Sequence, residues 1–165
     1  MKPFRRKGEE YVARLDSAEA GIVGLLLDQL EQLLAVDADD AGGDPVVERL
    51  FPAGHRSDPD VAAEYRDLTE ASLRQDKSDD LATVRATLPL GGGEVRLDED
   101  QARAWLRTSN DLRLALGTRL EITEDSPAPG DPEVEDDHQL AVYHWLTAVQ
   151  GSLVDALVAG PRGRR

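Results

Sequence analysis

The feature that most constrains the fold is a dense apolar run near the N-terminus. Eight large aliphatic residues occur between Ile22 and Leu34, and on a helical wheel they cover well over half of the circumference. Such an arc is too wide for a helix that has one face in water. Asp16 and Glu19 have the spacing of a capping box, which marks the start of the helix. We therefore predict a helix over residues 17–36 that lies at the centre of a helical core.

Short strands are predicted on both sides of this helix in the sequence. Residues 3–6 and 10–15 flank a Lys-Gly turn and predict a hairpin. Residues 95–102 repeat the pattern of residues 13–20, which is a short apolar strand, a capping aspartate and the start of a helix. Two such units could pair their strands and place their helices side by side.

The remaining elements are predicted from proline, glycine and aspartate signals. Asp58-Pro59 opens a helix that runs to about Gln75, and Ser78 begins a separate short helix that ends before Pro89. The other predicted elements are a short helical or irregular segment at 46–51, a glycine turn at 91–93, and helices at 99–121 and 137–159. We predict a mainly α fold, a bundle of about five helices with a small β element from the short N-terminal and central strands, in a single domain over 1–165.

Charge and composition restrict the classes of function. Nineteen basic against 33 acidic residues give a net charge of −14, which repels phosphate backbones and disfavours broad nucleic-acid binding. Two groups of cations could still form a local basic patch, and they are Lys2, Arg5, Arg6 and Lys7, and Arg162, Arg164 and Arg165. The chain has no cysteine, which excludes disulfides and thiolate chemistry.

The sequence indicates a cytoplasmic protein. No apolar run approaches the roughly 20 residues that cross a bilayer. The N-terminal cations are not followed by an apolar stretch, so no secretory signal is predicted. Residues 123–137 contain three prolines and seven acidic residues without a cation, which predicts a solvated, flexible acidic loop, and residues 160–165 form a basic tail.

The helix predicted at 99–121 carries an arginine on its apolar face. The apolar residues of this face are Ala102, Trp105, Leu106, Leu112, Leu116 and Leu120. Arg113 falls inside the face, and Asn110 lies at its border. A guanidinium in such a place must be paired or must meet a polar group at an interface. A buried structural pair is the commoner explanation, and contact with a partner or an anion is the alternative.

The helix predicted at 137–159 has an aromatic residue beside its core stripe. Tyr143 and Gln150 lie within the stripe, whereas Trp145 lies well off it. An aromatic side chain in this position is either the edge of the packed core or an anchor at an interface. The sequence does not favour one over the other.

No pattern in the chain indicates an enzyme, a cofactor or a metal site. His55, His138 and His144 do not have the spacing of convergent metal ligands. The glycines at 91–93 lack the context of a phosphate-binding loop, and no GxSxG segment occurs. An enzyme with a site distributed over the fold stays open as an alternative, because catalytic groups can come from distant parts of a chain.

Several segments resemble one known family in the same order along the chain. The most specific segment runs from Asn110 to Gly117 (Asn-Asp-Leu-Arg-Leu-Ala-Leu-Gly) and follows Trp105-Leu106. The other matching pieces are Arg49-Leu50-Phe51-Pro52, Glu64-Tyr65-Arg66, Leu73-Arg74 with Lys77, and Tyr143-His144-Trp145 with Gln150. Together they resemble an actinobacterial domain-of-unknown-function family named for the oxidative-stress transcriptional regulator AosR.

The resemblance implies a cytoplasmic regulator that works with RNA polymerase or a sigma factor. Genes of the family also tend to lie beside that of the Clp protease adaptor, which implies a rival role as an adaptor in Clp-linked proteolysis. Redox sensing through cysteine, which the name of the family suggests, does not carry over, because this chain has no cysteine.

We therefore expect a non-enzymatic regulatory protein that acts through protein–protein interaction, without a cofactor and with weak or no direct nucleic-acid binding. The candidate partner-binding residues are Trp105, Asn110, Asp111, Arg113, Tyr143 and Trp145. A homodimer is a further alternative, because the apolar surface of the first helix is wider than one small domain can bury.

Overall fold

The computed structural model describes residues 1–35, 44–51, 59–128 and 137–159, and within helix α3 the side chains of residues 59–68 are left aside. In chain order the elements are β1 (Lys2–Lys7), β2 (Glu10–Leu15), α1 (Ser17–Ala35), α2 (Pro45–Leu50), α3 (Pro59–Thr87), β3 (Gly93–Leu97), α4 (Glu99–Arg119) and α6 (His138–Val158). The predicted fold class, mainly α with a small β element, is confirmed. His55, the predicted basic tail and most of the predicted acidic loop lie outside the described residues.

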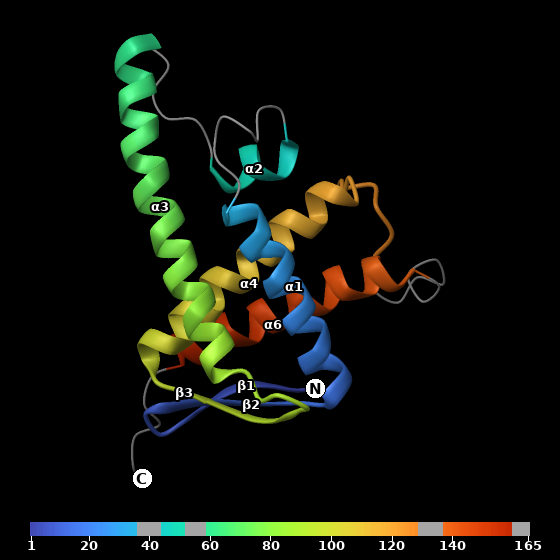
Figure 1. Cartoon of the computed structure of the whole chain (residues 1–165). Coiled ribbons are helices and arrows are strands. Elements are labelled where there is room, and N and C mark those ends of the chain that lie inside the picture. Colours follow the sequence, from blue (N-terminus) through green and yellow to red (C-terminus); the bar gives the residue numbers. More distant parts are fainter. Residues whose placement is uncertain (36–43, 52–58, 129–136, 160–165) are drawn as a thin grey trace.

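The strands form one antiparallel sheet in the order β1-β2-β3 at one end of the helices (Figure 1). Val12 of β2 pairs with Arg5 of β1 and with Arg96 of β3. The pairing of β2 with β3 confirms that the two repeated strand–aspartate–helix units join through their strands. The inner face of the sheet is apolar, since Tyr11 and Leu97 are opposite one another and buried.

The capping aspartates predicted at Asp16 and Asp98 are confirmed in detail. Asp16 accepts a hydrogen bond from the Glu19 amide, and the Asp16 amide donates to the Glu19 carboxylate, both at 2.8 Å. Asp98 and Gln101 form the same reciprocal box at the start of α4. Each box satisfies amides that the first turn of a helix leaves without partners.

The turn before β3 requires glycine at one position. Gly92 has a φ of +94°, which L side chains rarely adopt, and a Cβ there would lie 2.7 Å from the backbone nitrogen of Ser17. The turn therefore lies directly against the start of α1. This contact joins the N-terminal unit to the second strand–helix unit.

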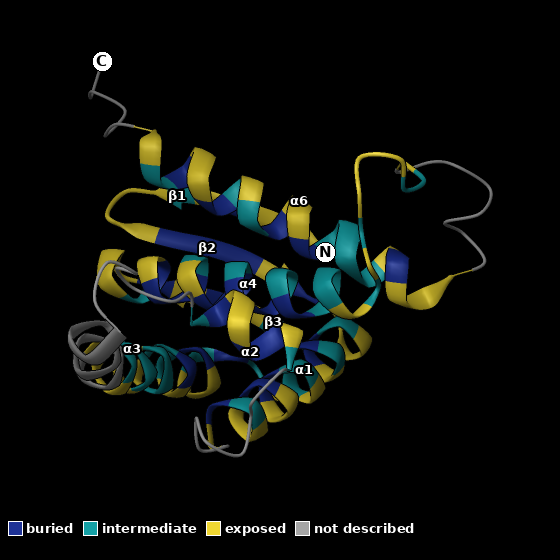
Figure 2. Cartoon of the chain, turned by 90° about the horizontal axis from the view of Figure 1, so that it is seen from above, coloured by how far each residue is buried: buried dark blue, intermediate teal, exposed yellow. Residues whose placement is uncertain are grey.

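The central helix is α4, and the predicted central place of residues 17–36 is wrong. Helix α4 contacts α2, α3 and α6 as well as α1, and Figure 2 shows α6 on one side of it and α1 and α3 on the other. Helix α1 buries one stripe against its neighbours, while Leu25 is 64% exposed and Leu26 and Leu33 are partly exposed. The apolar residues of α1 therefore extend beyond the stripe that packs against its neighbours and reach the exposed side of the helix.

Helix α3 runs without a break through the point where two helices were predicted. No glycine or proline occurs between Gln75 and Ser78, so nothing in the backbone ends the first helix. The Gln75 side chain donates to Asp79 across this point at 2.9 Å. Ser78 therefore lies within a helix instead of capping one, and α3 extends from the core beyond the other helices (Figure 1).

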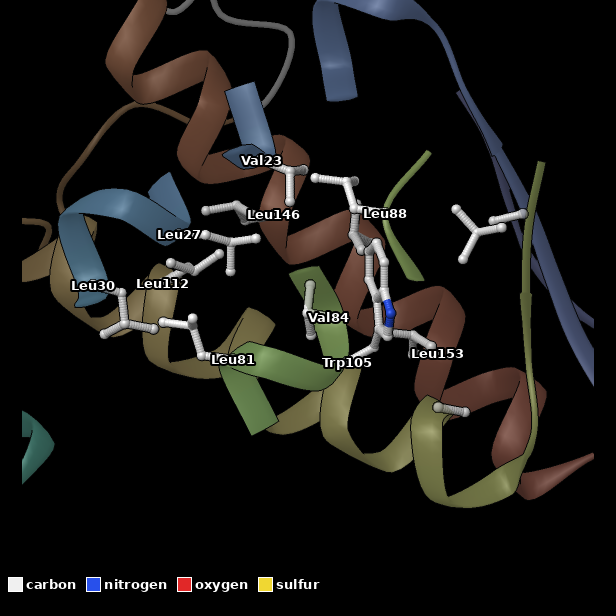
Figure 3. Packing of buried hydrophobic residues seen from close by; sticks show 14 of the residues in the cluster. Val23, Leu27, Leu30, Leu81, Val84, Leu88, Trp105, Leu112, Leu146 and Leu153 are labelled. Atoms are coloured by element: carbon white, nitrogen blue, oxygen red, sulfur yellow. The ribbon is translucent and has the colours of Figure 1, made fainter. Parts of the chain in front are cut away.

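The core gathers between α1, α3, α4, α6 and the inner face of the sheet. Figure 3 shows Trp105 of α4 among Val84, Leu88 and Leu153, which come from the C-terminal end of α3 and from α6. Phe4 of β1 meets the Trp105 ring edge-on, with centroids 5.6 Å apart. In the described part of the chain, no helix is long and apolar enough to cross a membrane.

Candidate functional site

Of the candidate partner-binding residues on α4, one lies in the core and two form polar contacts with neighbouring helices. Trp105 is 3% exposed, and its indole nitrogen donates to the Thr87 hydroxyl at 2.7 Å. The structure therefore places it in the core. The other candidates on α4 are one helical turn further along, where Asp111 meets α3 and Asn110 meets α6.

Asp111 forms an ion pair between helices α3 and α4. The Lys77 ammonium donates to both carboxylate oxygens of Asp111 at 2.8 Å. Only 14% of the lysine side chain and 8% of the aspartate side chain are exposed. Burial raises the pKa of Asp111 above its ordinary value, because desolvation outweighs the opposing effect of the Lys77 charge and hydrogen bonds. The pair is therefore a buried link between two helices.

A polar cleft of about 580 Å³ lies between α3 and α4 beside this ion pair. Its lining residues are Leu73, Asp76, Lys77, Asp79, Asp80, Arg107, Asn110 and Asp111. Arg107 spans the cleft and donates to both oxygens of Asp80, at 2.8 and 2.9 Å. Four carboxylates and two cations line the cleft, and within the described structure only Asp80 and Asp111 are paired with a cation of the opposite helix.

On its other side, α4 contacts α6 through a second set of candidate residues. The Gln150 amide donates to the Asn110 side-chain oxygen at 3.2 Å. At Gly117 an added Cβ would lie 2.9 Å from Cε2 of Tyr143, so the tyrosine ring packs on the bare backbone of the glycine. We call these residues, together with Arg113, the α4–α6 seam: Asn110, Arg113 and Gly117 of α4, and Tyr143 and Gln150 of α6.

Arg113 is the unpaired member of the α4–α6 seam. It lies three residues after Asn110 and four before Gly117, and residues with this spacing share one side of a helix. Its Nε atom is buried without a hydrogen-bond acceptor, and the described residues provide no carboxylate within ion-pair distance of its guanidinium. The internal ion pair that was the commoner expectation for Arg113 is therefore not found.

Trp145 packs against the edge of the core. Its side chain is partly buried and contacts the apolar cluster. The indole nitrogen is buried without a partner, as is the Thr108 hydroxyl, and both residues line one small cavity of about 10 Å³. The structure thus favours the packing-edge interpretation of Trp145 over that of an exposed anchor.

A neighbouring histidine links α6 to the segment that follows α4. The Nε2 atom of His144 lies 3.1 Å from the Pro127 carbonyl oxygen, and its ring meets Tyr143 edge-on. In the described parts of the chain, no group of three His, Asp or Glu side chains is placed to hold a metal ion.

Two contacts of the site could not be inferred from the sequence. Lys77 is 34 residues before Asp111, and Tyr143 is 26 residues after Gly117. Both pairs contain residues of the segments that carry the family resemblance. The family resemblance was the signal in the sequence that pointed to these residues, but it does not predict which of them contact one another.

The whole-chain comparison decides the family. A family model described as a domain of unknown function, DUF2017, matches residues 1–157. The chain belongs to this family. A relative from Mycobacterium leprae that carries the AosR name is 35% identical over 90% of this chain and 79% of its own length. The oxidative stress regulator AosR of Mycobacterium tuberculosis strain H37Rv is 32% identical over 88% of this chain and 78% of its own length. No solved structure matches the chain.

Membership of the DUF2017 family confirms the resemblance seen in the sequence. The segment from Asn110 to Gly117, which is the most specific part of that resemblance, provides the α4 side of both polar contacts. In this DUF2017 chain the motif therefore joins α4 to α3 and to α6.

Proposed function

We propose that this DUF2017 protein is a non-enzymatic regulatory protein of the cytoplasm that binds RNA polymerase or a sigma factor. The names of the mycobacterial relatives support a regulatory role, since they describe oxidative stress regulators. The net charge of −14 favours a protein partner over direct binding to a nucleic acid. Thiol sensing is not part of the proposal, because the chain has no cysteine.

The observation that carries the proposal is the unpaired Arg113. A guanidinium whose Nε is buried without an acceptor has lost hydration that no internal contact replaces. A carboxylate from a partner protein could accept two parallel hydrogen bonds from it, which is the geometry in which arginine binds most strongly. The α4–α6 seam, in which Tyr143 packs on Gly117 one turn after Arg113, is therefore our proposed contact region.

The first test is affinity purification of the tagged protein from its own host, followed by mass spectrometry. We expect polymerase or sigma subunits to be enriched with the wild type and lost with Arg113→Ala. The matched control is Arg103→Ala, which removes an exposed arginine of the same helix whose partner among the described residues is Glu99, one turn away. That variant should retain the partner.

Other results would contradict the proposal in distinct ways. Enrichment of Clp components would indicate an adaptor in Clp-linked proteolysis. Absence of any specific partner would favour an enzyme with a distributed site, for which the cleft between α3 and α4 would be the first place to search. The expected homodimer through α1 stays a prediction, and light scattering during the purification would measure it.

A further inference from the structure

The charges of this protein are distributed very unevenly between the sheet and the rest of the chain. The three strands contain six cationic side chains and two carboxylates, so they carry a net charge of about +4. The whole chain has 19 cations and 33 carboxylates. The remainder therefore has 13 cations and 31 carboxylates, a net charge of −18. The sheet is therefore cationic, whereas the rest of the chain, helices and connecting segments together, is strongly anionic.

Strand register places most of these cations on the outer face of the sheet. Arg5, Val12 and Arg96 are direct partners across the three strands, and residues opposite one another share a face. Alternation along β2 adds Arg14 to this face, and Lys7 joins it as the partner of Glu10. The helices cover the opposite, apolar face, so the outer face points away from the body of the protein (Figure 1).

The cations of β1 and β2 on this face are not neutralised internally. Arg96 is held by Glu94 and Glu10, whose hydrogen bonds and charges raise its pKa. In contrast, Lys2, Arg5, Lys7 and Arg14 are exposed and form no ion pair within the described structure. We define the outer sheet face by these four residues together with Val12 and Arg96.

We propose that the outer sheet face is a docking surface for an acidic segment of a partner protein. The observations favour a protein over a nucleic acid for three reasons. Glu10 and Glu94 interrupt the cations on the same face and would repel a continuous row of phosphates. Tyr11 points into the core, so among the strand residues no exposed aromatic ring is available to stack on a base.

The third reason is the range of electrostatic forces. At physiological ionic strength charges are screened beyond about 8 Å. A short acidic segment on the sheet therefore responds mainly to the free cations beneath it. A long polyphosphate would extend beyond the small sheet toward the rest of the chain, which has a net charge of −18. This surface is separate from the α4–α6 seam, and its proposal does not depend on Arg113.

The test measures binding of a short fluorescein-labelled peptide of alternating Glu and Ser by fluorescence anisotropy. The test variant is the double substitution Arg5→Ser, Arg14→Ser, and we expect its Kd to rise by roughly tenfold. The matched control is Arg85→Ser, Arg103→Ser, which changes the net charge equally but removes arginines of α3 and α4. We expect the control and Arg113→Ala to bind the peptide as the wild type does. Thermal unfolding would verify that all variants fold.

Three results would overturn the proposal. The first is equal weakening in both double variants, which would reveal a general charge effect. The second is no measurable binding of the peptide to the wild type at low salt. The third is tighter binding of a duplex DNA than of the peptide, with a loss in the Arg5, Arg14 variant, which would assign the face to nucleic acid. Amide shifts in NMR spectra should be confined to the strands when the peptide binds.

Discussion

Lys77 and Asp111 show how a single ion pair can be both necessary and costly in this protein. Both side chains are largely removed from water, and each therefore requires the other. The pair joins α3 to the central helix α4 next to the polar cleft. Removing one partner leaves a buried charge without compensation, whereas replacing both by apolar groups removes the desolvation cost as well.

We expect Lys77→Met to lower the free energy of unfolding by about 3 kcal/mol, because it leaves Asp111 buried and unpaired. Lys77→Met combined with Asp111→Leu should recover most of this loss. Urea denaturation of the wild type, both single variants and the double variant measures the coupling. Additive losses in the double variant would show that the pair does not act as a unit.

The raised pKa of Asp111 also predicts a pH dependence with a definite sign. The folded state binds the Asp111 proton more tightly than the unfolded chain, whose aspartates titrate near about 3.9. The stability that this group contributes is therefore largest at low pH and decreases as the pH rises through its folded pKa. Relative to Asp111→Asn, the wild type should lose unfolding free energy as the pH is raised across this interval. A difference that stays constant, or that grows with pH, would contradict the raised pKa.

At the scale of elements, the packing of α4 against α6 depends on one glycine. The ring of Tyr143 occupies the space that a side chain at residue 117 would need. Helix α6 has its own glycine, Gly151, which has no neighbouring atom within 4 Å of an added Cβ. The two positions therefore separate the effect of helix propensity from that of interhelical packing.

Gly117→Ala should destabilise the protein by about 1–2 kcal/mol, because the clash with Tyr143 exceeds the gain in helix propensity. Gly151→Ala should stabilise it by roughly 0.5–1 kcal/mol, since only the propensity changes there. Thermal unfolding followed by circular dichroism compares the two. Equal stabilisation by both substitutions would mean that the Tyr143 ring moves aside without cost.

At the scale of the whole molecule, the dominant feature is its net charge of −14, with the negative charge concentrated outside the sheet. Like charges repel one another in the compact state, and salt screens this repulsion. The exposed ion pairs, such as Arg85 with Asp28, are weakened by salt, but each contributes less than about 1 kcal/mol. Repulsion should therefore decide the response to salt.

We expect the Tm to rise by a few degrees when sodium chloride is raised from about 0.01 to 0.15 M, the range over which the screening length falls from about 30 to 8 Å. Differential scanning calorimetry at constant pH measures this. An Asp79→Asn, Glu99→Gln variant, with two fewer negative charges, should show a smaller rise. A Tm that falls with salt would show that favourable ion pairs outweigh the repulsion.

The sequence by itself determined the helical class, the hairpin, the capping boxes and the pairing of the repeated strands. These features depend on local periodicity and on caps within a few residues, as at Asp16 and Glu19. Tertiary structure alone decided that α4 and not α1 is central, and that α3 continues through Ser78. It also decided that Lys77 meets Asp111 and that the Nε of Arg113 is buried without an acceptor among the described residues. Which face is buried, and which charge is paired, depends on neighbours distant in the chain, and local patterns carry no information about them.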